Sequence, residues 1–123
     1  MDAGNIALTG LQAASLQVNV AANNIVNVLS GGAVPTSDEA YDGYIAQEVA
    51  LTSQPGAGVV AGTRPVTPAF VTVPGADGVP QALPNVDLVS QILTLKTAEI
   101  AYQASAALIR RDDENERTLL DTV

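Results

Sequence analysis

Both ends of this chain carry apolar residues at alternating spacings of three and four, and this pattern restricts the fold more than any other feature. In the first segment, Gly4 and Ala7 are followed at this spacing by Leu11, Ala14, Val18, Ala21, Ile25 and Val28. In the last segment the same spacing relates Leu88, Ile92, Leu95, Tyr102, Ala106 and Ile109. Glu99 occupies the one position of this series that is not apolar. Such seams pack against other helices, so these twelve residues from Leu11 to Ile109 are the candidate assembly interface.

The two seams predict two long helices with an intervening segment of another kind. The first helix is expected over residues 5–28, because Ser30, Gly31 and Gly32 stop it and Pro35 bars its continuation. The last helix is expected over residues 87–120, with Asn85 or Asp87 as its N-cap. The chain therefore divides into an N-terminal helix (1–30), a middle segment (31–84) and a C-terminal helix (85–123).

The middle segment contains all seven prolines of the chain and short runs that are typical of strands. Residues 44–51, 58–61 and 69–73 are the predicted strands, separated by turns at Pro55-Gly56 and Pro74-Gly75. The predicted fold class is mainly α with a small β subdomain, in which the terminal helices pair as a coiled coil around a short β or irregular middle segment.

The first helix has an unusual outer face. Residues 3–37 contain no charged side chain, and amides occupy positions 12, 17, 19, 23, 24 and 27. An exposed helix in water usually carries charge on that face, so the amides favour a surface that meets other protein surfaces. The simpler alternative is an ordinary amphipathic helix on a globular core.

Composition excludes several functions. A formal net charge of -8 argues against nucleic acid and anionic membrane surfaces as partners, and no apolar run is long enough for membrane insertion. The absence of His and Cys removes the usual general base and thiolate ligands. The acidic clusters at 38–42 and 112–116 are interpreted as solvated charge, so we expect no enzyme activity, no cofactor and no metal. No signal peptide is visible at the start of the sequence.

The two ends together resemble a known family. Residues 5–14 (NIALTGLQAA) and 19–25 (NVAANNI) are similar to the N-terminal signature of bacterial flagellar basal-body rod and hook proteins. Residues 84–89 (PNVDLV), 101–104 (AYQA) and 119–121 (LLD) are similar to the C-terminal signature, most of all that of the C-type proximal rod proteins. The chain departs from the family pattern at residues 25–30 (IVNVLS), and it lacks the Asp-Pro and His-Pro stretch that often precedes the C-terminal signature.

The resemblance implies a structural subunit of the flagellar rod. Members of the family leave the cytoplasm through the flagellar type III export apparatus without signal cleavage. They assemble helically in the periplasm with copies of themselves and other rod subunits, with their terminal helices forming an inner coiled-coil layer, and the rod transmits torque. The alternative is a helical hairpin that binds another protein without polymerising.

Overall fold

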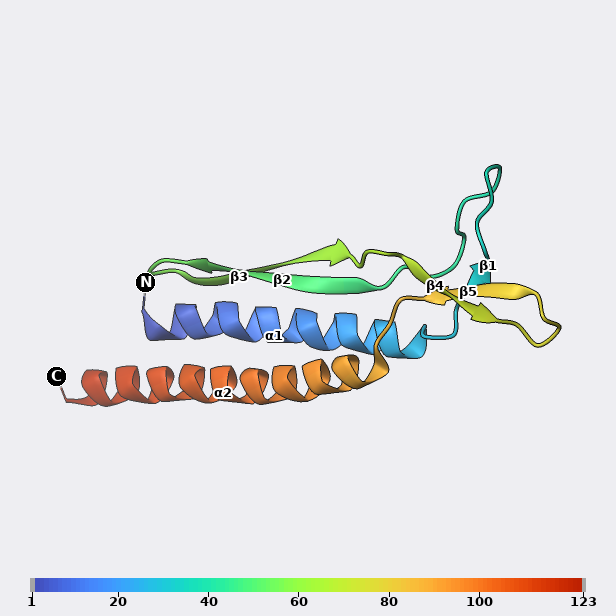
Figure 1. The fold of residues 1–123 in the computed structure, drawn as a ribbon. Coiled ribbons are helices and arrows are strands. Elements are labelled where there is room, and N and C mark those ends of the chain that lie inside the picture. Colours follow the sequence, from blue (N-terminus) through green and yellow to red (C-terminus); the bar gives the residue numbers. More distant parts are fainter. Residues whose placement is uncertain (1, 123) are drawn as a thin grey trace.

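The computed structural model describes residues 2–122. Along the chain, a long helix comes first, five strands follow and a second long helix comes last (Figure 1). About 48% of the chain is helical and 23% is in strands. Helix α1 lies in the middle of a three-layer arrangement. Helix α2 packs along one side of it, and the hairpin of β2 and β3 lies along the other side (Figure 1).

Helix α1 spans Ala3–Val26, two residues earlier at each end than the sequence predicted. Asp2 is the N-cap, and its Oδ1 accepts a hydrogen bond from the Asn5 N–H at 2.8 Å. This bond satisfies one of the N–H groups that the start of a helix leaves without a partner, so the helix begins directly after Asp2, at Ala3. Val28 therefore lies just beyond the helix.

Helix α2 spans Leu88–Asp121, close to the prediction, and Asp87 is its N-cap. The two helices are antiparallel: the Gly4 N–H donates to Asp112 Oδ2 at 2.9 Å at one end, and Asn24 contacts Gln91 at the other. The predicted pairing of the terminal helices is therefore confirmed, whereas their supercoiling as a coiled coil stays a prediction. The last turns of α2 extend past the start of α1 (Figure 1).

The first sheet is the hairpin of β2 (Gln47–Gln54) and β3 (Gly58–Pro65). Its strands pair in an antiparallel register that runs from Gln47 opposite Pro65 to Gln54 opposite Gly58. The turn uses Gly56 and Gly58, both with positive φ, which glycine adopts without steric cost. At about 3.4 Å per residue, eight-residue strands are ~27 Å long and cover most of α1, which is ~36 Å long.

The second sheet lies beyond the end of α1 and has the order β1-β5-β4 (Figure 1). It comprises β1 (Gly32–Ala33), β4 (Phe70–Pro74) and β5 (Pro80–Pro84), all antiparallel. The Tyr41 ring packs on Phe70 with ring centroids 5.0 Å apart. This contact fixes the loop between β1 and β2 against β4.

The predicted fold class, mainly α with a small β subdomain and a short β or irregular middle segment, is wrong. The middle forms two antiparallel sheets, and one of them is a full layer packed on α1. The sequence did not predict strand β5, because this strand begins and ends with proline, which is unfavourable within a sheet. The hairpin strands were predicted too short or displaced, because they do not alternate cleanly between buried and exposed residues.

Candidate assembly surface

The α1–α2 contact is built from small side chains. Ala7, Ala14 and Ala21 recur at intervals of seven residues on α1, and all three are buried. On α2, Ala98 is the one fully buried side chain among the described residues, at 1% exposure. Gly10 adds to this close approach, because a Cβ there would lie 2.9 Å from Ser105 Oγ. The small residues of the predicted α1 seam therefore face α2.

The twelve predicted interface residues fall into three classes of exposure in the structure. Ala14 and Ala21 are fully buried, and partly buried positions are held by Leu11, Val18, Ile25, Val28, Leu95, Ala106 and Ile109. Leu88, Ile92 and Tyr102 keep more than two fifths of their surface exposed. These three lie on one flank of α2, because at about 100° per residue they are rotated away from the direction of Ala98. Part of the predicted seam is thus left uncovered by α1.

Asn24 ties all three layers together, although its sequence context placed it on the outer amide face. Its side chain is fully buried. Asn24 Nδ2 donates to the Gln47 carbonyl oxygen at 2.7 Å and to Gln91 Oε1 at 3.0 Å. Asn24 Oδ1 accepts from the Tyr44 hydroxyl at 2.9 Å and from the Gln47 N–H at 3.1 Å. All four hydrogen-bonding positions of the amide are used, which makes this burial tolerable.

Tyr44, which donates to Asn24, is itself partly buried. Burial raises the pKa of the Tyr44 phenol above its ordinary value. A phenol of ordinary pKa near 10 is already protonated at neutral pH, so the hydroxyl donates to Asn24 there, and the raised pKa extends this range toward alkaline pH. The other amides of the outer face differ, since Asn19 and Asn23 are exposed as expected.

Helix α2 has far more apolar surface than α1 covers. Among the helices and strands, α2 packs only against α1 within residues 2–122. Val89, Leu93 and Ile100 are each more than 60% exposed. The helical repeat places these three on the side opposite Ala98, and we call them the outer stripe of α2. Sequence reasoning missed this stripe because it followed the seam, although Leu93 and Ile100 are seven residues apart.

A groove runs beside the line where the two helices meet. It has a volume of about 520 Å³, and it is lined by Ser15 and Val18 of α1 and by Leu95, Glu99, Tyr102 and Gln103 of α2. The walls are mainly the apolar parts of Val18, Leu95 and Tyr102. Three of the predicted interface residues thus line an open groove, with Glu99 at its edge in the slot that breaks the heptad.

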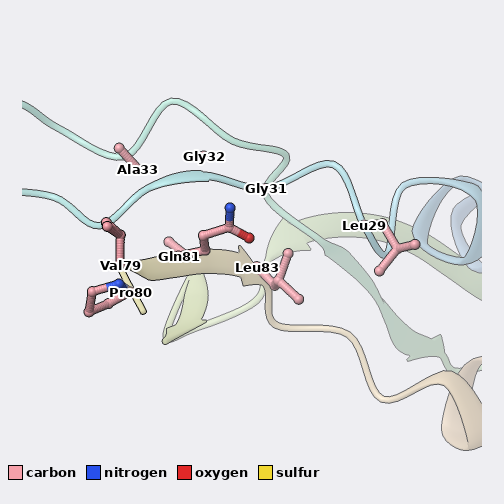
Figure 2. Close-up of a pocket in the computed structure, with 9 residues that line it drawn as sticks. Leu29, Gly31, Gly32, Ala33, Val79, Pro80, Gln81 and Leu83 are labelled. Atoms are coloured by element: carbon pink, nitrogen blue, oxygen red, sulfur yellow. The ribbon is translucent and has the colours of Figure 1, made fainter. Parts of the chain in front are cut away.

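A second hollow lies where the end of α1 meets the second sheet (Figure 2). Figure 2 shows Leu83 and Gln81 of β5 on its floor, with Leu29 at one end and Val79 at the other. Its volume is about 470 Å³. Leu29 and Val79 are largely exposed, so an apolar surface is also present at the end of the molecule opposite the last turns of α2.

Three carboxylates of helix α2 and its N-cap have defined partners. Asp112 accepts from Gly4, and Asp113 forms an ion pair with Arg117 at 3.0 Å. Asp87 accepts from the Ser90 N–H and hydroxyl, and the backbone hydrogen bond from Ser90 is the main reason that the pKa of Asp87 lies below its usual value. Within residues 2–122, no group of three or more Asp or Glu side chains is arranged to hold a metal ion.

No helix within the described part of the chain combines the length and apolar character needed to cross a membrane. No protein-family model matches the chain, and no curated protein matches it significantly.

Proposed function

We propose that this chain is a structural subunit that assembles with copies of itself and with related subunits through the uncovered faces of its paired helices, as an axial subunit of a bacterial flagellar rod. The observation that carries the proposal is the exposure of α2. This 34-residue helix buries only Ala98 fully, yet it presents Leu, Ile, Val and Tyr side chains to solvent along most of its length.

The exposed area is large enough to drive association. Fully burying one Val, Leu or Ile side chain contributes about 1.5–3 kcal/mol. The three residues of the outer stripe are each about two thirds exposed, so burying them would contribute roughly 3–6 kcal/mol before the costs of association are subtracted. A patch of this kind is rare on a protein that works alone and is typical of an interaction surface.

The rod assignment rests on the terminal motifs. Most residues of the segments that resemble the two rod signatures lie in α1 and α2, and these helices pair with each other within one chain; residues 84–87 of the C-terminal signature precede α2. In this proposal, export from the cytoplasm through the flagellar apparatus precedes assembly in the periplasm. The uncharged amide face of α1 is where neighbouring subunits would pack without desolvating a charge.

A second candidate function is a protein-interaction module that does not polymerise. The Asn24 cluster favours it, because one copy satisfies every hydrogen bond of this buried amide and joins its own three layers. Such a unit folds without a neighbour and could present the outer stripe to a different protein.

The cellular test replaces the chromosomal gene by variants in the source bacterium. Ile100→Asp and Ile92→Asp put a charge on α2 surfaces that α1 does not cover, and Ser37→Asp adds the same charge in an exposed loop as a matched control. The rod proposal predicts loss of swimming and of complete basal bodies in both helix variants, with normal protein levels and normal swimming in the control. Normal swimming of a strain that lacks the gene would refute the rod assignment.

A further inference from the structure

The β2–β3 hairpin has two outer edges whose free hydrogen-bonding groups can be assigned from its ladder. The Val66 N–H donates to the Ala46 carbonyl oxygen at 2.9 Å, just before the strands begin. In an antiparallel ladder, residues alternate between bonding inward to the partner strand and pointing outward. On both strands the even-numbered residues therefore bond inward to the partner strand, and the odd-numbered residues point their N–H and carbonyl groups outward.

Two contacts with α1 support this assignment. Gln47, an outward residue of β2, bonds through its N–H and its carbonyl to Asn24. Val59, an outward residue of β3, donates its N–H to Thr9 Oγ1 at 3.1 Å. Helix α1 thus occupies the base of the β2 edge and the tip of the β3 edge. Val49, Leu51 and Ser53 on β2, and Ala61 and Thr63 on β3, are the outward residues that α1 does not engage within residues 2–122.

These edges lack the features that usually protect an exposed strand. Natural edges are blunted by charged side chains, by proline within the strand or by bulges. From residue 49 to residue 63 the ribbon has no charged residue, and its one proline, Pro55, lies in the turn. Leu51, at the centre of the β2 edge, is 50% exposed. In a chain with net charge -8, this ribbon is a surface where two copies can approach without like-charge repulsion.

We propose that the free edge of β3 pairs with the free edge of β2 from a second copy of this chain, so that hairpins of successive copies form one continuous antiparallel sheet. The proposal rests on the assembly function above and names a second contact for it. Two hairpins that point the same way bring β3 of one copy antiparallel to β2 of the next, so each copy uses one edge on either side.

Charge selects the register of this contact. Within the hairpin, Glu48 lies opposite Arg64 and the two side chains form an ion pair. Repeating that register between copies places Leu51 opposite Ala61 of the neighbouring copy, Val49 opposite its Thr63 and Glu48 opposite its Arg64. Carboxylate and guanidinium groups would then alternate across the sheet.

A two-fold pairing of β2 with β2 is the competing arrangement of two copies. In the register centred on Leu51, it places Glu48 opposite Gln54. It leaves the β3 edge unpaired, and Arg64 then has only Glu48 of its own chain as a partner. The head-to-tail arrangement uses both edges and matches the charges. Such a heterologous contact extends into an open assembly, whereas the two-fold contact stops at a dimer.

Cysteine substitution tests the contact directly, because the natural chain has no cysteine. Leu51→Cys and Ala61→Cys are made as two separate full-length proteins. Each then has a single cysteine and cannot form an internal disulfide, and a difference in mass between them distinguishes the mixed product from the symmetric ones. They are mixed at concentrations where the wild-type chain associates and are then mildly oxidised. Directly opposite residues that share hydrogen bonds have Cα atoms about 5.5 Å apart, within the range of a disulfide.

The proposal predicts that the mixed 51–61 disulfide exceeds its statistical share and that both symmetric disulfides fall below theirs. Leu51→Lys is expected to weaken association, whereas Ser37→Lys, with the same change in net charge, is not. A dominant 51–51 disulfide would replace the proposal by the two-fold dimer. Association without any enrichment of the 51–61 product would overturn the strand contact alone, and a wild-type chain that never associates would overturn the assembly function with it.

Discussion

Replacing Asn24 by Ala is the sharpest test of how this chain holds its three layers together. The substitution removes four hydrogen bonds that join α1 to the Gln47 main chain, to the Gln91 side chain and to the Tyr44 hydroxyl. All three partners are partly buried, but the Gln91 and Tyr44 side chains can turn toward water whereas the main chain of Gln47 is held in β2, so most of the cost comes from Gln47. Its N–H and carbonyl group are both left without their partner.

The size of the effect follows from those two backbone groups. A buried donor or acceptor left unsatisfied costs about 1–3 kcal/mol. With two such groups, Asn24→Ala is therefore expected to lower the free energy of unfolding by ~2–6 kcal/mol. Urea unfolding followed by far-ultraviolet circular dichroism, with linear extrapolation to water, measures this difference.

Asn23→Ala is the matched control. Asn23 is the adjacent residue on the same helix, but it is exposed, and its side chain only donates to the Asn19 carbonyl of its own helix. Alanine is the better helix former, so the control should change stability by less than about 0.5 kcal/mol. Equal effects of the two substitutions, or an Asn24→Ala effect below ~0.5 kcal/mol, would refute the role of Asn24 as the link between layers.

Three further predictions concern packing and pH. Ala14→Leu puts a large side chain at a fully buried position of α1, and it should lower the free energy of unfolding by about 1–3 kcal/mol in the same urea assay, whereas the same change at exposed Ala104 should have little effect. Tyr44 has a raised pKa in the folded state. Its contribution to stability is therefore complete below the unfolded pKa near 10 and is lost as pH rises through the folded pKa. Tyr44→Phe should flatten the decline of the thermal unfolding midpoint at alkaline pH. Asp87 has a lowered pKa, so its contribution is present above the unfolded pKa and is lost as pH falls through the folded pKa; Asp87→Ala should remove that part of the acid decline, and an unchanged acid profile would contradict the capping role.

The two helices could be predicted from the sequence because their signals are local. Seven-residue spacing of Ala7, Ala14 and Ala21 reports the packed face of α1 directly, and Asp87 begins α2 as a cap should. The β layer could not be predicted in the same way. Packing on one face would give a clean two-residue alternation of burial, but residues 51–54 of β2 and 62–65 of β3 are exposed throughout, so the alternation is lost over half of each strand.

The role of Asn24 was hidden for a related reason. Its neighbours Asn19 and Asn23 are exposed amides, and nothing in their spacing distinguishes Asn24 from them. What distinguishes it is the main chain of Gln47, which arrives 23 residues later along the chain. The outer stripe differs again, because helical spacing could have revealed Leu93 and Ile100, but only the structure shows that no other helix or strand within residues 2–122 covers them.

Sedimentation velocity of the purified chain over a concentration series tests the assembly claim most directly. The claim predicts reversible association of the wild-type chain. Ile100→Asp should weaken this association by roughly five- to thirtyfold, since burying the 68% of Ile100 that is exposed contributes ~1–2 kcal/mol and 1.4 kcal/mol corresponds to about a tenfold change. Ser37→Asp should associate as the wild type does. A wild-type chain that sediments as a monomer at every concentration, or an Ile100→Asp variant that associates unchanged, would contradict the account.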